Sequence, residues 1–172
     1  IKSFMRFMQY RLPAALAQIQ RMLAIPAKKK ETRLVKHLTV AEMQAILDAP
    51  VPTCRDGIRD RAMLHLCFAA GLRVSELVGL QLTDLKLQPC SSILIHGKGR
   101  KERCLPLWKQ TAKALRAWLE VRGAVSGVCL FLNARGEAMT RSGFEYILDK
   151  HVKVAAATCS SLSHKLIPPH VL

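Results

Sequence analysis

Apolar residues recur at helical spacing over residues 1–25, and Pro13 interrupts the run. The pattern predicts two short helices that are separated near this proline. Two short helices cannot bury such a stripe between them, so we interpret this stretch as the tail of a larger helical domain. Residues 26–38 follow with a run of basic side chains and no hydrophobic period, which is typical of an exposed linker.

The next apolar stretches predict one capped helix and one longer helix. Thr39, followed three residues later by Glu42, forms a capping box, in which each side chain accepts a backbone N–H at the helix start. A second helix is expected over residues 56–70, and Gly71 is placed to close it because glycine readily adopts the left-handed conformation. A short amphipathic helical turn then follows to residue 80.

The hydrophobic period changes from helical to alternating after residue 80. Three short alternating runs predict a small antiparallel sheet, at residues 84–87, 92–96 and 102–107. The turn between the last two runs reads Gly97-Lys98-Gly99-Arg100-Lys101. Its glycines permit a tight turn that presents Lys98 beyond the sheet.

Helical spacing returns in the last part of the chain. One helix is expected over residues 109–122, and Thr140 predicts the start of another. The expected fold class is therefore α+β, mainly helical, with one small antiparallel sheet.

The charge of the chain favours a polyanionic partner. Its 172 residues include 27 Lys and Arg against 12 Asp and Glu, which gives a net charge of +15. Nine basic residues and one acidic residue lie in residues 1–38. Nucleic acid is the first candidate partner. No run of about 18 apolar residues is present, so a membrane partner is not expected.

The cysteines give no sign of a metal site. Six cysteines are scattered without a C-x-x-C pair and without clustering near the six histidines. We interpret them as scattered thiols of a cytoplasmic protein, and we expect no metal site among them.

A charged residue stands between apolar neighbours in the stretch Gly71-Leu72-Arg73-Val74-Ser75-Glu76-Leu77. A helical turn would place Glu76 beside Arg73. A surface ion pair at a helix start would explain the two charges. The alternative is that a partner such as Glu76 holds the Arg73 side chain inward.

Three motifs, taken in order, resemble the tyrosine recombinases of the phage-integrase family. They are the stretch around Arg73, the Gly97-Lys98-Gly99 turn, and Pro169-His170-Val171-Leu172. The resemblance implies a catalytic domain at residues 39–172, incomplete at its C-terminus. It also implies that residues 1–25 are part of a helical, SAM-like core-binding domain and that residues 26–38 are a basic linker.

The resemblance implies site-specific DNA recombination and integration, such as a mobile element requires. Arg73 matches the first catalytic arginine, and Glu76 would orient it. Lys98 matches a general acid in the hairpin, and His170 matches the histidine of the His-x-x-Arg motif. The residues expected to contact DNA are Lys28, Lys29, Lys30, Arg33, Lys36, Arg100, Lys101 and Arg103. Without the resemblance, Lys98 would be a solvated basic residue at a turn and His170 a plain loop residue.

The family's second arginine, its later histidine or tryptophan and its nucleophilic tyrosine lie downstream of His170, whereas the sequence stops at Leu172. Neither Tyr10 nor Tyr146 stands where the nucleophile should. We therefore expect these 172 residues alone not to cleave DNA. The resemblance also implies that the full protein acts on double-stranded DNA as a homotetramer on paired sites, without a metal or other cofactor. Two alternatives stay open: a non-catalytic DNA-binding protein or integrase remnant, and an RNA-binding or ribosome-associated basic protein.

Overall fold

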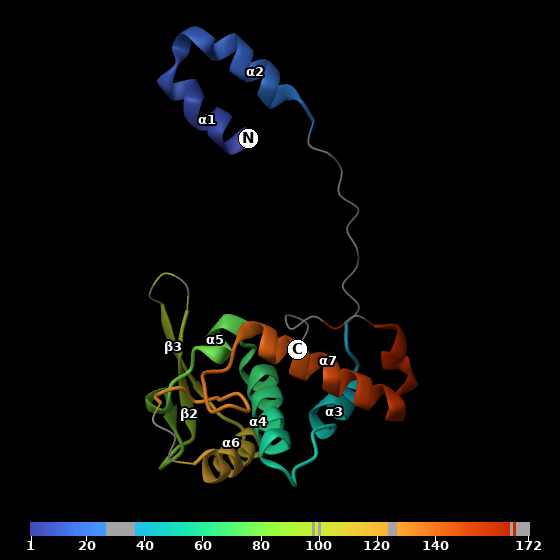
Figure 1. The fold of residues 1–172 in the computed structure, drawn as a ribbon. Helices are drawn as coiled ribbons and strands as arrows, with labels where there is room; N and C mark the ends of the chain where they lie inside the picture. Colours follow the sequence, from blue (N-terminus) through green and yellow to red (C-terminus); the bar gives the residue numbers. More distant parts are fainter. Residues whose placement is uncertain (27–36, 98, 100, 124–126, 166, 168–172) are drawn as a thin grey trace. The chain divides into compact units, whose positions relative to one another are not determined.

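The structure is a computed structural model that describes residues 1–26, 37–97, 99, 101–123, 127–165 and 167. The chain forms two compact units, Ile1–Leu34 and Val35–Leu172 (Figure 1). The division between the units falls within the predicted linker, residues 26–38.

The first unit is a pair of helices. Helix α1 (Lys2–Arg11) and helix α2 (Leu16–Ala24) are joined by a 3-10 turn at Pro13–Ala15, which confirms the predicted break. Within residues 1–26 only Ile19 is buried, and Phe4 is 57% exposed. The two helices thus leave apolar surface uncovered, which supports the interpretation that they belong to a larger helical domain; that interpretation stays a prediction.

The second unit is built around helix α4 (Arg55–Ala70), which packs against α3 (Val40–Asp48), α5 (Val74–Val78) and α6 (Lys109–Arg122). Helix α7 (Arg141–Thr158) packs against α3 and α5 (Figure 1). The largest fully buried side chains of this core include Trp118, Phe131, Phe144, Met63 and Leu66. Among the residues that the structure describes, no helix is both long and apolar enough to cross a membrane.

The predicted helix caps are present. The Thr39 N–H donates to the Glu42 carboxylate at 2.8 Å, and the Glu42 N–H donates to the Thr39 hydroxyl at 3.3 Å. Gly71 closes α4 with φ of 54°, the left-handed conformation that the sequence predicts. The Thr140 hydroxyl accepts the Gly143 N–H at 3.1 Å and so caps α7.

The sheet is antiparallel with strand order β1-β2-β3. Its strands are β1 (Leu85–Lys86), β2 (Ser92–His96) and β3 (Glu102–Pro106), close to the predicted runs. In the β2–β3 register, Ile95 pairs with Arg103 and His96 with Glu102. The predicted α+β fold, mainly helical with one small antiparallel sheet, is confirmed.

Candidate functional site

Arg73 lies at the start of α5, where the core fixes the backbone on both sides of it. Leu72 and Val74 are buried, and Leu77 is completely buried one turn further on. Because these three apolar side chains point into the core, the intervening Arg73 is directed outward, and 75% of its side chain is exposed. The sequence therefore presents a guanidinium to solvent from a rigid base.

Glu76 holds the Arg73 guanidinium in place through hydrogen bonds. Only 5% of its side chain is exposed. One carboxylate oxygen, Oε1, accepts Arg73 Nη1 at 3.1 Å, and the other, Oε2, accepts the Arg73 backbone N–H at 3.0 Å. Glu76 thus sits beside Arg73 as the helical spacing predicts, and it fixes both ends of the arginine.

Arg103 is a second partner of the same carboxylate. It comes from β3 and donates Nη2 to Glu76 Oε2 at 2.9 Å and Nη1 to Oε1 at 3.2 Å. Its hydrogen bonds are the largest contribution that lowers the pKa of Glu76 from 4.5 to about 2. The sequence predicted a phosphate contact for Arg103 and missed this pairing. Alternation along β3 was the available signal, because Arg103 and Leu105 share the less exposed face of the strand.

The base of the hairpin lies next to this cluster. The Gly97 N–H donates to the Lys101 carbonyl at 2.7 Å. A methyl group added at Gly97 would lie 3.7 Å from Arg103 Nη1 and 3.8 Å from Glu76 Oε1. A side chain at Gly97 would therefore be in van der Waals contact with the carboxylate that holds Arg73, and glycine leaves this space open.

The structure brings together Arg73, Glu76, Arg103 and the hairpin base at Gly97 and Lys101. The other predicted site residues lie outside the described residues, so their predicted roles stay predictions: Lys98, His170, Arg100, Lys28, Lys29, Lys30, Arg33 and Lys36. Within the described part of the chain, no group of three His, Cys, Asp or Glu side chains could hold a metal ion.

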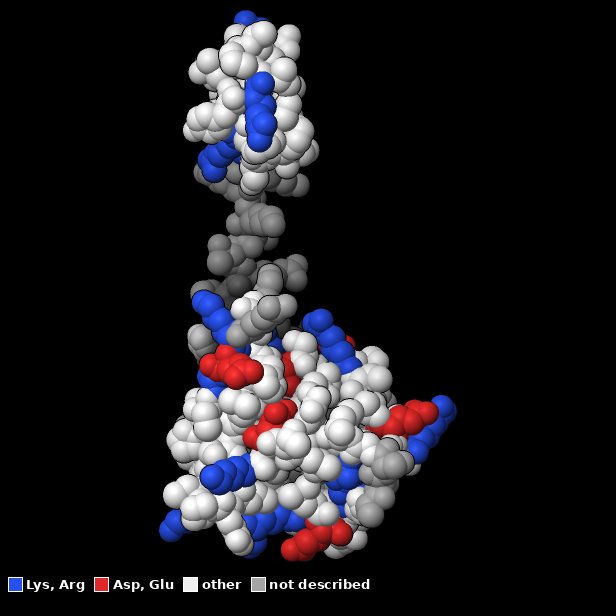
Figure 2. All heavy atoms as spheres, turned by 90° about the vertical axis from the view of Figure 1, so that its left-hand side faces the viewer, with Lys and Arg blue, Asp and Glu red and all other residues white. Residues whose placement is uncertain are grey.

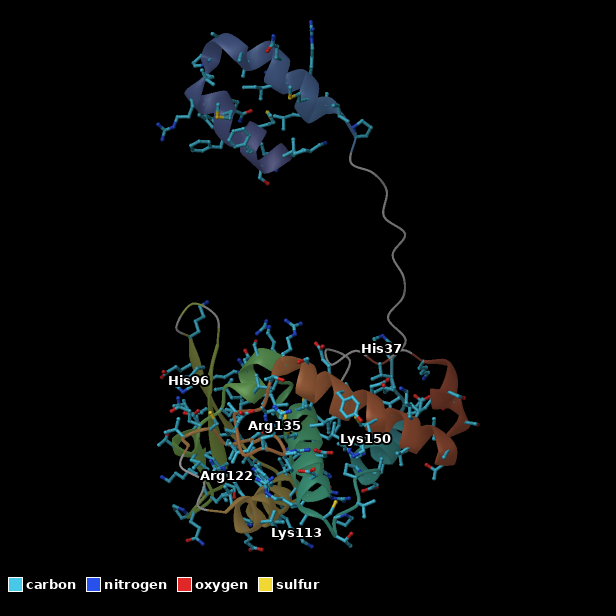
Figure 3. All side chains as sticks on the ribbon, viewed as in Figure 1. His37, His96, Lys113, Arg122, Arg135 and Lys150 are labelled. Atoms are coloured by element: carbon cyan, nitrogen blue, oxygen red, sulfur yellow. The ribbon has the colours of Figure 1, made fainter. Side chains whose placement is uncertain are left out.

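His96 is the last residue of β2 (Figure 3). It lies between two carboxylates. Its Nε2 is 2.9 Å from Asp84 Oδ1, and its Nδ1 is 3.1 Å from Glu102 Oε1. The hydrogen bond with Asp84, followed by the one with Glu102, raises the pKa of His96. This imidazole therefore links β3 to the 3-10 helix Leu82–Asp84 that precedes β1, immediately beside the hairpin turn. From the sequence alone, His96 is expected to be a structural or solvated histidine.

A second carboxylate anchors the segment that leads toward His170. Lys165 Nζ donates to both oxygens of Glu42 at 2.7 Å and to the His37 carbonyl at 3.2 Å. The Ser161 hydroxyl also donates to Glu42. These bonds, led by Lys165, lower the pKa of Glu42 from 4.5 to about 2. Residues 161–165 are thereby joined to the start of α3.

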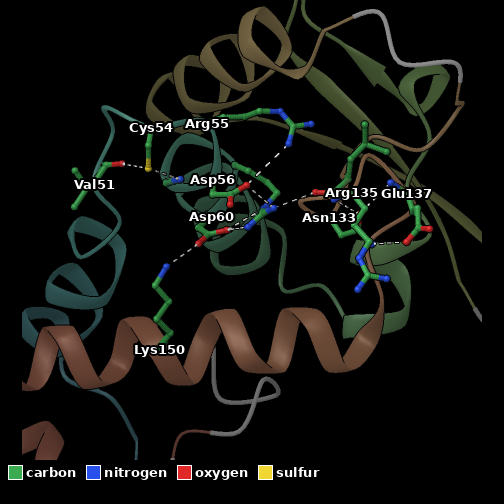
Figure 4. Close-up of polar contacts among 12 residues, drawn as sticks. Val51, Cys54, Arg55, Asp56, Asp60, Asn133, Arg135, Glu137 and Lys150 are labelled. Atoms are coloured by element: carbon green, nitrogen blue, oxygen red, sulfur yellow. Dashed lines mark hydrogen bonds and ion pairs between the residues drawn. The ribbon is translucent and has the colours of Figure 1, made fainter.

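A buried ionic network fixes α7 on α4. Arg59 donates to Asp60 at 2.7 and 2.9 Å and to Asp56 at 2.9 Å. His151 Nε2 on α7 lies 2.9 Å from the other oxygen of Asp60, Oδ2. Lys150 Nζ lies 4.0 Å from the same oxygen (Figure 4). Arg59, Asp60 and His151 are all buried. The network is a scaffold contact, because these three residues have little access to solvent or to a ligand.

The model of the phage integrase family matches residues 36–172. The chain belongs to the phage integrase family. This confirms the family that the three motifs around Arg73, Lys98 and His170 suggested, and with it the assignment of the fold to the tyrosine recombinases.

Two curated relatives show how much of a family member the chain represents. It is 41% identical over 172 residues to the putative integrase/recombinase y4rC of Sinorhizobium fredii, covering 100% of this chain and 52% of that protein. It is 36% identical over 173 residues to the tyrosine recombinase XerC of Pelobacter propionicus, covering 100% of this chain and 54% of that protein. The chain thus spans about half the length of these relatives.

Solved structures of two recombinases share the fold. The crystal structure of XerA recombinase superposes with a TM-score of 0.67 at 23% identity, over 96% of this chain and 57% of that one. The XerH site-specific recombinase, bound to palindromic difH substrate in a post-cleavage complex, superposes with a TM-score of 0.70 at 24% identity, over 87% of this chain and 44% of that one.

Proposed function

We propose that the protein carrying these residues is a site-specific tyrosine recombinase that cuts and rejoins double-stranded DNA. The observation that carries the proposal is the exposed guanidinium of Arg73, held at the start of α5 by the buried Glu76, in a member of the phage integrase family. A guanidinium of fixed orientation offers planar, permanently charged donors that match the oxygens of a phosphate. The relatives named recombinases, and XerH bound to its DNA substrate, support the same reaction.

The residues fit transesterification at a phosphodiester. A tyrosine hydroxyl, which the family pattern places downstream of His170, gives up its proton to solvent as its oxygen attacks the phosphorus, and the bond from phosphorus to the 5′-oxygen breaks. Negative charge gathers on the non-bridging oxygens, where Arg73 stabilises it. Lys98 gives a proton to the departing 5′-oxygen, and His170 donates a hydrogen bond to the phosphate. One ester replaces another, so the exchange needs no cofactor.

DNA binding follows from charge. Basic side chains are spread over the face shown in Figure 2 and are interspersed with acidic ones. Contacts to the DNA backbone are assigned to the basic residues of 26–38 and to the hairpin, where Lys101 is exposed. By family resemblance the full protein acts in the cytoplasm as a homotetramer on paired sites.

A trapping experiment tests the proposal. The whole gene product is incubated with a duplex that carries its recombination site and a nick close to the scissile phosphate, so that the released fragment diffuses away. The expected result is a detergent-resistant adduct on a 3′-phosphate with a free 5′-hydroxyl. The 172-residue stretch alone is expected to give no adduct. Tight, salt-sensitive binding of the whole gene product without any adduct would favour the non-catalytic DNA-binding alternative.

A further inference from the structure

We infer that Arg103 is a positioning residue. It holds Glu76 so that the Arg73 guanidinium keeps its orientation and the cluster of three side chains keeps a net positive charge. It also attaches the β2–β3 hairpin to the same carboxylate. The inference rests on the proposed function, because it concerns the same phosphate site. It replaces the phosphate contact that the sequence predicted for Arg103.

The hydrogen bonds show a shared carboxylate. Glu76 Oε1 accepts both guanidinium groups, from Arg73 at 3.1 Å and from Arg103 at 3.2 Å. Glu76 Oε2 accepts the other prong of Arg103 at 2.9 Å and the Arg73 backbone N–H at 3.0 Å. The two-pronged bond from Arg103 fixes the plane of the carboxylate. That plane in turn sets the direction from which Arg73 can bind Glu76.

The charges make the second arginine necessary. One buried carboxylate faces two guanidinium groups, so the cluster of Arg73, Glu76 and Arg103 keeps one net positive charge. Without Arg103, Glu76 would neutralise Arg73, and the pair would offer no net charge to a phosphate. Exposure divides the roles, because 75% of the Arg73 side chain is exposed but only 37% of that of Arg103.

The hydrogen bonds between Arg103 and Glu76 also fix the position of the β2–β3 hairpin relative to α5. Arg103 pairs with Ile95 across the strands that flank the turn, and Gly97 leaves no side chain between the turn and Glu76. The strand leaving the turn is thus attached to α5 through a charged hydrogen bond. Lys98, in the turn itself, is the proposed general acid. Arg103 therefore couples the element that carries the proposed acid to the element that carries Arg73.

The experiment measures single-turnover cleavage by the whole gene product under saturating protein. Two substrates are compared: the natural scissile phosphate, and a methylphosphonate in which a methyl group replaces one charged non-bridging oxygen. Arg103→Gln is expected to slow cleavage of the natural phosphate by about 100-fold, as misplacement of a catalytic group does. On the uncharged substrate the loss should shrink below about 10-fold, because the charge that Arg73 stabilises is absent. Arg103→Lys, which keeps the charge but not the two-pronged bond, should be intermediate on the natural phosphate.

Lys101→Gln provides the comparison for a direct phosphate contact. It removes one positive charge from the same hairpin, and it should weaken DNA binding and reduce the salt slope by about 0.9. Arg103→Gln should change the dissociation constant and the salt slope much less than Lys101→Gln does, because Arg73 is the exposed guanidinium of the cluster and Arg103 is turned toward Glu76. The inference is overturned if Arg103→Gln behaves like Lys101→Gln, or if its rate loss is equal on both substrates. If the wild-type protein cleaves neither substrate, the proposed function itself fails, and this outcome is distinct from a failure of Arg103 alone.

Discussion

Replacing Glu42 by Gln tests how the segment before His170 is anchored. The Glu42 side chain is 2% exposed and receives two bonds of 2.7 Å from Lys165, together with the Thr39 N–H at 2.8 Å. Glutamine has nearly the same shape and keeps one oxygen for the Thr39 N–H. The substitution therefore removes mainly the charge that Lys165 binds.

The size of the effect follows from the burial and pairing of Glu42. Removing one charge of a buried pair costs roughly 3–5 kcal/mol, because the remaining charge is left without its partner. Part of this is regained because Lys165, whose side chain is 19% exposed, can be partly solvated. We expect Glu42→Gln to lower the free energy of unfolding at pH 7 by about 2 kcal/mol.

The pH dependence separates this account from a packing defect. Because the pKa of Glu42 is lowered in the native state, its contribution is fully present above pH 4.5 and is lost as the pH falls toward about 2. Urea unfolding at pH 7 and at pH 3 measures the difference between wild type and variant. Glu120→Gln, at an exposed carboxylate on α6, is the matched control and should change stability by less than about 0.5 kcal/mol. A Glu42→Gln loss that is equally large at both pH values would refute the reasoning.

Three further substitutions test the scaffold, and urea or thermal unfolding measures the change in the free energy of unfolding. Gly57→Ala should lower this free energy by at least about 3 kcal/mol, because the added methyl would lie 1.9 Å from the Val51 carbonyl oxygen. A neutral effect would show that Gly57 does not lie so close to Val51. Gly71→Ala should cost only about 1 kcal/mol, since φ is 54° but no atom lies within 4 Å of the added methyl; a loss as large as that of Gly57→Ala would contradict this. Asp60→Asn should cost about 3 kcal/mol, because it leaves Arg59 buried without the charge of its closest partner; a loss below 1 kcal/mol would show that the network contributes little.

Local signals in the sequence predicted most of the elements. The Thr39–Glu42 capping box, the left-handed Gly71 and the break near Pro13 each depend on residues within one helical turn, and each is present. Alternation located the three strands to within one or two residues. These features are predictable because backbone geometry at a cap or turn is decided by neighbours in sequence.

Partners distant in sequence were not predictable in the same way. Glu76 and Arg103 are 27 residues apart, and Glu42 and Lys165 are 123 apart. A period shows which face of an element is buried, but not which charge on another element lies opposite. Glu42 was therefore predicted as a cap and missed as the partner of Lys165. The roles of Lys98 and His170 depend on the family resemblance and stay predictions.

A structure of the whole gene product on its DNA site, before cleavage, tests the central claim most directly. The account predicts that the Arg73 guanidinium, the Lys98 amine and the His170 imidazole all lie within hydrogen-bond or one-water distance of a single phosphate, about 3 to 5 Å. It also predicts that Arg103 remains on Glu76 and does not contact DNA. Separations of more than about 15 Å among the three groups, too far for a common phosphate, would contradict it.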